Sequence, residues 1–402
     1  MSEPSAGKGP RVAIIGAGAA GCFCAIELKR RLPQASVVVY EAGSKPLAKV
    51  AVTGGGRCNF TNSFRDVERL EDVYPRGARL MKRLLAAFGP SDVRAWFERE
   101  GVPSVVQEDQ CVFPESQDAM QIVRTLLRLM RELGVRLECG RRIGGAGEID
   151  ADAVVVTVGG NSERVLRSLL PSDIEITPTV PSLFTFRIGD EALCSLMGTV
   201  AADATVGLAG TPLRASGPLL ITDWGVSGPA VLRLSSYAAR HLAEAGWKGT
   251  LLVNWAGLDE ARARSLLSAL GRENPQKMVS STPAQGLSGR LWKHIAGRAG
   301  LRADIRWSEL GSKGLSRLVN SLLCDSYPIT GRARFKEEFV TCGGVALGEV
   351  DPRTLQCRKH PGLYFAGEVL DVDALTGGFN LQAAWSSAVA VAAAIAQSAA
   401  EL

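Results

Sequence analysis

The chain has 402 residues, enough for two or three domains, and its 46% hydrophobic and 22% charged residues exclude a wholly disordered protein. The 46 Lys and Arg residues against 41 Asp and Glu leave a net charge of only +5 without a basic run, so we expect no nucleic acid partner. Nine cysteines without metal-ligand spacing predict free thiols and no metal site. The first ten residues are polar and the most apolar run, Ala388–Ala396, is short, which predicts a cytoplasmic protein without membrane contact.

The first elements are predicted to be a strand, a glycine turn, a helix and a second strand. An apolar strand over 12–15 precedes a G-x-G-x-x-G turn made of Gly16, Ala17, Gly18, Ala19, Ala20 and Gly21. A helix over 19–31 and a strand over 36–40 follow, and the strand ends at Glu41. Gly16 suits the tight turn, Gly18 the approach of a pyrophosphate, and Gly21 the packing of helix on strand. Glu41 is placed to accept hydrogen bonds from a ribose, so the pattern predicts a dinucleotide site and leaves FAD or NAD open.

A glycine-rich segment follows the second strand. Gly54, Gly55 and Gly56 stand between Lys49 and Arg57, and Asn59 continues the segment. We expect a functional loop whose N–H groups meet an anion or a ring edge. Cys58 has no neighbouring His or paired Cys, so it is expected to be a bystander thiol.

Helices and strands alternate over the next hundred residues. Helical periodicity covers 76–100 and 118–133, and strands are predicted over 135–138 and 153–160, the second closing on Gly159. This alternation predicts a parallel sheet with helices on its faces.

The middle of the chain changes character. Short strand-like pieces extend from Pro178 to about Trp255, and the chain is mostly helical from Leu258 to Leu323. We therefore expect an inserted β-rich domain at 181–257 and a small helical domain at 258–330.

The C-terminal residues repeat the strand, glycine turn and helix pattern of the N-terminal part. A strand ends on Gly367 and Glu368, and Gly378, Phe379, Asn380 and Leu381 open a long helix. This ending favours FAD, which is longer than NAD and needs a second anchor. Glu368 is expected near the ribityl hydroxyls or water bound to the pyrophosphate. The helix near Asn380 is expected to aim its positive end at the flavin pyrimidine.

With these motifs the chain resembles a family of bacterial NAD(P)/FAD-dependent flavoproteins, the BaiN/RdsA-like group, some of which are described as aminoacetone-oxidase-like. The resemblance rests on residues 53–62, 112–114, 225–229, 340–345 and 362–382. It implies an α/β fold with a glutathione-reductase-type FAD-binding Rossmann domain built from residues 1–180 and 331–402, around the inserted β-rich domain and the small helical domain.

Pattern and resemblance together give one set of candidate FAD-binding residues. They are Gly16, Ala17, Gly18, Ala19, Ala20, Gly21, Glu41, Lys49, Gly54, Gly55, Gly56, Arg57, Asn59, Gly159, Gly367, Glu368, Gly378, Phe379, Asn380 and Leu381. The chain departs from the family pattern at Asp223, where His is usual, at Ala374, where Gly is usual, and at Phe379, where Tyr is usual.

The resemblance implies an FAD oxidoreductase that is reduced by NADH or NADPH and passes hydride to a small organic acceptor. Some family members reduce double bonds conjugated to a ketone in steroid-like substrates. The alternatives are a flavoenzyme that modifies tRNA and a non-catalytic flavin-binding protein. No second G-x-G-x-x-G follows a strand, so the nicotinamide is expected to visit transiently. No general acid is nominated from the sequence.

Overall fold

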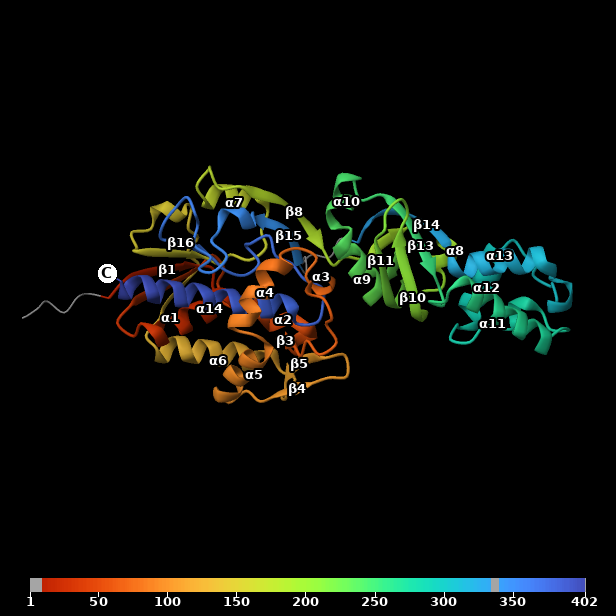
Figure 1. Cartoon of the computed structure of the whole chain (residues 1–402), viewed down its shortest axis with the longest axis horizontal. Coiled ribbons are helices and arrows are strands. Elements are labelled where there is room, and N and C mark those ends of the chain that lie inside the picture. The colour runs from red at the N-terminus through yellow and green to blue at the C-terminus, as the bar shows by residue number, and fades with distance from the viewer. Residues whose placement is uncertain (1–8, 334–339, 402) are drawn as a thin grey trace, which may run out of the picture. The chain divides into compact units, whose positions relative to one another are not determined.

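The computed structural model describes residues 9–333 and 340–401, which form two compact units (Figure 1). The first unit, called the FAD unit below, comprises residues 9–180 and 340–401, and the second, the barrel unit, comprises 181–333. Most of the polar N-terminal segment, on which the expected cytoplasmic location partly rests, lies outside the described residues.

The FAD unit is built on a parallel sheet. Its strands, from edge to edge, are β16 (Leu363–Phe365), β7 (Ala153–Val156), β1 (Arg11–Ile15), β2 (Ser36–Glu41) and β6 (Arg136–Cys139). Ile15 lies opposite Tyr40 on one side and Val156 on the other, so these strands end at the same edge. The central strands are short apolar runs because both of their faces are covered.

α-Helices accompany the strands in both units. Those of the FAD unit are α1 (Ala19–Arg31), α2 (Ala48–Gly56), α3 (Leu70–Val73), α4 (Ala78–Ala87), α5 (Pro90–Arg99), α6 (Ala119–Glu132), α7 (Glu163–Leu169) and α14 (Phe379–Ala400). The helical pattern predicted over 76–100 is divided between α4 and α5, because Pro90 cannot continue a helix from Gly89.

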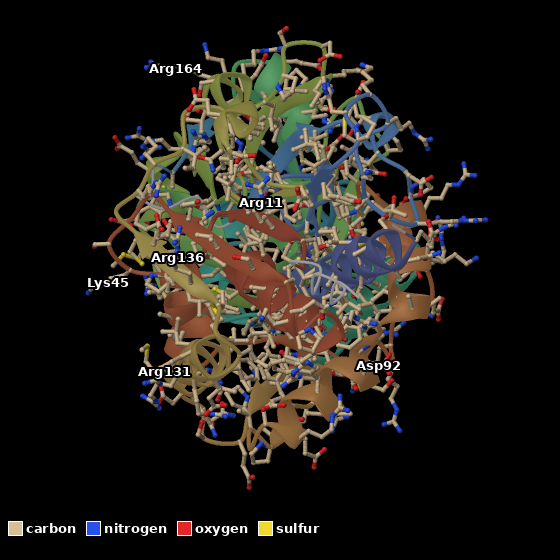
Figure 2. The ribbon with its side chains drawn as sticks, turned by 90° about the vertical axis from the view of Figure 1, so that its left-hand side faces the viewer. Arg11, Lys45, Asp92, Arg131, Arg136 and Arg164 are labelled. Carbon is tan, nitrogen blue, oxygen red and sulfur yellow. The ribbon has the colours of Figure 1, made fainter. Side chains whose placement is uncertain are left out.

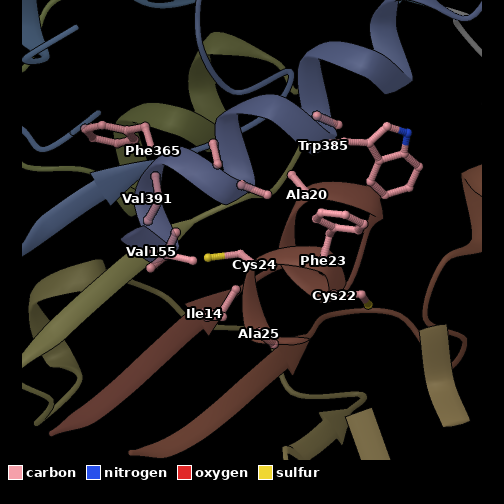
Figure 3. Packing of buried hydrophobic residues seen from close by; sticks show 14 of the residues in the cluster. Ile14, Ala20, Cys22, Phe23, Cys24, Ala25, Val155, Phe365, Trp385 and Val391 are labelled. Atoms are coloured by element: carbon pink, nitrogen blue, oxygen red, sulfur yellow. The ribbon is translucent and has the colours of Figure 1, made fainter. Parts of the chain in front are cut away.

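Helix α14 packs along α1 in the core of the unit. Figure 3 shows Phe23 of α1 next to Trp385 of α14, and their ring centroids are 5.1 Å apart. By length and mean hydropathy (1.4) α14 could cross a membrane, but 72% of its apolar window is buried within the protein. The apolar stretch is thus longer than the nine residues recognised in the sequence, and its burial makes it a core helix.

Two small sheets complete the FAD unit. One contains β3 (Thr61–Asn62), β5 (Cys111–Pro114) and β4 (Ser104–Val106), and the other pairs β15 (Val340–Val345) with β8 (Ile176–Ser182). The first of these brings the segment after α2 against residues 111–114, which places two motifs of the sequence side by side.

The barrel unit contains a closed antiparallel barrel. In spatial order its strands are β10 (Val200–Leu208), β11 (Arg214–Thr222), β12 (Gly225–Ser227), β9 (Phe186–Ile188), β14 (Asp325–Arg332) and β13 (Gly249–Asn254). The helices of this unit are α8 (Glu191–Cys194), α9 (Pro229–Tyr237), α10 (Ala239–Glu244), α11 (Glu260–Glu273), α12 (Gly289–Arg298) and α13 (Gly311–Leu323). Helices α11–α13, predicted as a separate small domain, share one hydrophobic cluster with the barrel.

Candidate FAD site

The glycine turn after β1 leaves open space at one position. A Cβ atom on Gly21 would lie 2.0 Å from the carbonyl oxygen of Gly16, and a Cβ on Gly16 would lie 2.5 Å from that of Thr157. These two glycines are therefore required by the fold itself. A Cβ on Gly18 would meet no atom within 4 Å. The opening over Gly18 has the form that a pyrophosphate needs to approach the backbone.

Helix α1 begins at this opening. Gly18 is its N-cap and provides no side-chain cap, so the first N–H groups of the helix, including those of Ala19 and Ala20, lack an intrahelical partner. No acidic residue stands in the first turn to compensate the positive end of the helix dipole. An anionic group would satisfy both the N–H groups and the dipole.

Glu41 is held beside the turn by backbone groups. Its Oε2 accepts a hydrogen bond from the N–H of Ala17 (2.9 Å), and its Oε1 accepts one from the N–H of Gly43 (2.7 Å). The side chain is half-buried, and each carboxylate oxygen keeps a lone pair for a further donor. The structure thus brings the predicted ribose-binding acid to the glycine turn.

We expect Glu41→Ala to weaken FAD binding about ten- to a hundredfold without unfolding the sheet. The charge-assisted hydrogen bonds lost with the ribose are worth about 1.5–3 kcal/mol. The dissociation constant of FAD, measured by flavin fluorescence quenching, tests this. Glu132→Ala, at an exposed position on α6, is the matched control, and an unchanged dissociation constant for Glu41→Ala excludes the role.

The three-glycine segment forms the end of α2 and was expected to be a loop. The helix is interrupted, because Thr53, Gly54 and Gly55 have non-helical backbone angles. Gly54, Gly55 and Gly56 all have positive φ, a region that favours glycine. A Cβ on Gly55 or Gly56 would meet nothing within 4 Å, so this backbone is also open on one side.

Two side chains of the same segment differ in their surroundings. Arg57 is exposed and its guanidinium lies 4.4 Å from the centroid of the Phe113 ring, which fixes the arginine without neutralising it. The Oδ1 atom of Asn59 is buried and has no hydrogen-bond partner within the described part of the chain. An unsatisfied buried acceptor costs free energy, so a ligand N–H that reaches Asn59 would be stabilised. Burial raises the pKa of Cys58 to about 12, which keeps it a protonated, unreactive thiol, as the sequence predicted.

Glu368 connects segments that are distant in sequence. Its two carboxylate oxygens accept hydrogen bonds from the N–H groups of Gly160 (3.1 Å) and Thr341 (2.9 Å), and Lys49 Nζ lies 3.7 Å from it. A Cβ on Gly159 would be 3.7 Å from Glu368 Oε2. Glu368 therefore acts first as a structural bridge, and its predicted contact with FAD would use the remaining lone pairs.

The start of α14 closes the site. Gly378 is the N-cap with φ 88° and no side-chain cap, and a Cβ there would lie 2.7 Å from Asn59 Oδ1. The Asn380 side chain is occupied, because it accepts from the Ala374 N–H (2.9 Å) and donates to the Ala374 carbonyl (3.0 Å). Asn380 could thus serve a flavin through its backbone N–H, while its amide shapes the preceding turn.

The remaining predicted residues lie at the edges of this arrangement. A Cβ on Gly367 would be 2.8 Å from the Cβ of Ala20, so Gly367 allows the C-terminal segment to approach α1. Phe379 is buried and stacks edge-to-face on Phe64, with centroids 5.1 Å apart. Leu381 is half-buried against the same core. Their role toward FAD remains a prediction.

Comparison with known proteins identifies this arrangement. Residues 10–394 match the HI0933-like protein Rossmann domain. The chain belongs to this family. It is a flavin-dependent oxidoreductase with an FAD-binding Rossmann domain and an inserted β-barrel, which confirms the predicted fold class and the resemblance.

Two curated relatives cover nearly the whole HI0933-like chain. The ribosomal RNA dihydrouridine synthase of Escherichia coli is 30% identical over 94% of this chain and 96% of its own length. The 3-dehydro-bile acid delta(4,6)-reductase of Clostridium scindens is 28% identical over 94% of this chain and 97% of its own. Among solved structures, E. coli quinol fumarate reductase FrdA has 15% identity and a TM-score of 0.46, covering 97% of this chain and 70% of that one.

The residues described above fit an FAD molecule. The fit rests on the opening over Gly18, the unpartnered Asn59 Oδ1, and the uncapped N-termini of α1 and α14. The expected loop at 53–56 is corrected to a broken helix, but its open glycine backbone is retained.

Sequence reasoning missed a buried ion pair next to the site. Arg76 Nε donates to Asp373 Oδ1 at 2.6 Å, and a second guanidinium nitrogen bonds the other oxygen. Asp373 is completely buried and precedes the turn that leads into α14. The Asp-x-Asp run at 371–373 inside an otherwise apolar segment was the available signal, since a buried carboxylate requires a cation.

Proposed function

We propose that this protein is an FAD-dependent reductase that uses NADH or NADPH to reduce a carbon–carbon double bond conjugated to a carbonyl. The observation that carries the proposal is the FAD cradle, formed by the opening over Gly18, by Glu41 and by the uncapped start of α14. The two relatives are named a ribosomal RNA dihydrouridine synthase and a 3-dehydro-bile acid delta(4,6)-reductase, and a reduced carbon–carbon double bond next to a carbonyl would be common to both products.

The reaction balances with one nicotinamide per double bond. FAD bound here would supply two-electron hydride transfer, from a nicotinamide to the electron-poor carbon of the acceptor, and a proton from solvent would complete the neighbouring carbon. The chain contributes binding and electrostatics. The first N–H groups of α14 lie at the positive end of the helix, where they stabilise negative charge. Asn59 Oδ1 offers an acceptor to a ring N–H, which would orient the flavin.

Two acceptor classes follow from this chemistry. The first is a small cyclic enone, which agrees with the small-molecule substrate expected from the sequence. The second is a uracil within RNA, and a specific observation favours it. The net charge of the chain is small, but a local excess of positive charge exists, because residues 258–330 contain 11 Lys and Arg and 6 Asp and Glu.

Product analysis tests the proposal. The purified holoenzyme is incubated under anaerobic conditions with NADH or NADPH and one acceptor, which is either a Δ4-3-keto steroid or a uridine-containing RNA. The masses of the products are then measured by mass spectrometry. We expect one acceptor to gain two hydrogen atoms per nicotinamide consumed. If neither acceptor gains hydrogen while the flavin is reduced, the acceptor chemistry proposed is wrong.

We also propose that the protein works in the cytoplasm. Reduced nicotinamides are abundant there, and its nine cysteines are all free thiols, several of them buried in the core. Immunolocalisation after cell fractionation tests this location.

A further inference from the structure

The net charge of the protein is concentrated in one stretch of sequence. Residues 258–330 carry 11 Lys and Arg and 6 Asp and Glu, while the rest of the chain carries 35 of each. The whole excess of +5 therefore belongs to the part of the barrel unit that contains α11, α12 and α13, which Figure 1 shows gathered beside the barrel strands. Such segregation produces a local positive potential that the overall charge does not reveal.

Helix α13 presents a basic and hydroxyl-bearing face. Ser312, Lys313, Ser316 and Arg317 are exposed and line an open pocket of about 590 Å³. The opposite side of α13, which includes Leu318 and Leu322, is buried in the core. We call this exposed face, with its four lining residues, the α13 pocket.

Cations from neighbouring elements flank the α13 pocket. Arg264 of α11 donates to Ser316 Oγ (3.3 Å), which places a third positive side chain at its edge. Arg306 precedes the short 3-10 helix Trp307–Glu309 that leads into α13, and the Trp307 N–H donates to the Lys277 carbonyl (3.1 Å). The contact with Ser316 places Arg264 at the pocket, and Arg306 lies in the segment of sequence that leads into α13.

Among the described residues, no carboxylate neutralises the two cations of the α13 pocket, Lys313 and Arg317. Arg317 donates a hydrogen bond to the carbonyl oxygen of Gly300 (3.4 Å), and Glu260 of α11 is bound to Arg264, so over residues 9–333 and 340–401 neither Lys313 nor Arg317 forms an ion pair. Lys313 and Arg317 are four residues apart on one helix, a spacing at which like charges repel. An external anion would relieve this repulsion, because the hydrogen bond of Arg317 to the neutral Gly300 carbonyl leaves its positive charge uncompensated.

We propose that the α13 pocket and the cations beside it form a docking surface for the phosphate backbone of RNA. This inference rests on the proposed reductase function and names RNA as the carrier of the double bond. Lys313 and Arg317 contact phosphate oxygens, and Ser312 and Ser316 donate hydroxyl hydrogen bonds to the same backbone. We expect this surface to recognise the charge and shape of RNA and not its base sequence, because Lys, Arg and Ser side chains are typical donors to phosphate oxygens.

The surroundings favour RNA over an anionic membrane. Membrane adsorption through a basic helix requires large apolar side chains next to the cations. In residues 258–330, Met278 is the large hydrophobic residue that is exposed, and it is not on α13. Hydroxyl groups alternate with cations along α13 instead, which suits repeated phosphates.

RNA binding by a double variant tests the proposal. Lys313→Ala/Arg317→Ala holoenzyme and wild type are titrated into a fluorescein-labelled RNA hairpin, and anisotropy is followed between about 50 and 200 mM KCl. Loss of two phosphate contacts should lower the slope of log K against log salt by roughly 1.8 and weaken binding at the lower salt roughly tenfold or more. Arg131→Ala/Arg142→Ala, two exposed arginines of the FAD unit (Figure 2 labels Arg131), is the matched control and should bind like wild type.

Each other outcome contradicts the docking surface. Equal binding by wild type and the α13 variant overturns it, and so does wild-type binding that is lost in millimolar inorganic phosphate, which would indicate a site for a single phosphate. Preferential binding of phosphatidylglycerol vesicles over the hairpin overturns it in favour of a membrane. Thermal unfolding controls for folding, because removal of two like charges should not lower the unfolding temperature.

The test separates the surface from the proposed reaction. Reduction of the bound flavin by NADH or NADPH needs no RNA. If the flavin is not reduced but the hairpin still binds, the proposed reductase function is contradicted and the proposed RNA-binding surface is not. Flavin reduction and steroid turnover without any hairpin binding contradict the surface alone.

Discussion

The variant Gly18→Val should fold like wild type and be purified without FAD. A Cβ at this position meets no protein atom within 4 Å, and the backbone of Gly18 (φ −85°, ψ −167°) is one that valine readily adopts. The branched side chain would instead fill the space that a pyrophosphate needs at the start of α1. The amount of bound FAD, measured by flavin absorbance, should fall from about one molecule per chain to near zero, while the circular dichroism spectrum stays unchanged.

Two further glycine variants make this result specific. Gly147→Val also enters open space in the FAD unit, in the short 3-10 helix Ala146–Glu148, which contains none of the candidate FAD-binding residues, and it should retain the flavin. Gly21→Ala should damage the fold itself, because its Cβ would lie 2.0 Å from the Gly16 carbonyl oxygen. If Gly18→Val retains a full complement of FAD, the pyrophosphate does not lie at this turn.

Arg76→Ala should lower the free energy of unfolding of the FAD unit by about 3–5 kcal/mol. The change leaves the carboxylate of Asp373 inside the protein without the cation that now binds both of its oxygens. The turn between Asp373 and α14 should loosen as well, so FAD affinity should fall. Urea denaturation with and without FAD measures both effects.

The same substitution at an exposed pair provides the control. Arg11 forms an ion pair with Asp150, whose side chain is 89% exposed, and such pairs contribute about 0–1 kcal/mol. Arg11→Ala should therefore have little effect on unfolding. If Arg76→Ala is as mild as Arg11→Ala, the buried pair does not stabilise the start of α14.

Local patterns in the sequence predicted the FAD unit well. The predicted helix over 19–31 coincides with α1, and the predicted strands before and after it match β1 and β2 closely, because apolar run, glycine turn and amphipathic period all agree over this stretch. Gly378 and Asn59 could be proposed separately for the site, but their mutual contact depends on how α14 returns to the N-terminal half. That return is a tertiary feature with no local signal.

Other features required the structure. The break in α2 arises because Gly54 and Gly55 adopt left-handed angles, which sequence permits but does not dictate. The occupied amide of Asn380 and the ion pair of Arg76 with Asp373 join residues through folded geometry. The basic stretch at 258–330 was different, since a charge count by segment, rather than over the whole chain, reveals it from the sequence.

The central claim is that a flavin held at the Gly18 turn carries hydride from a nicotinamide to a conjugated double bond. Anaerobic stopped-flow absorbance of the FAD-loaded protein tests it most directly. NADH or NADPH should bleach the oxidised flavin band, and a stoichiometric amount of a conjugated acceptor, steroid or RNA, should then restore it as the acceptor gains two hydrogens. A flavin that neither nicotinamide bleaches, or a bleached flavin that is restored only by oxygen, would contradict the account.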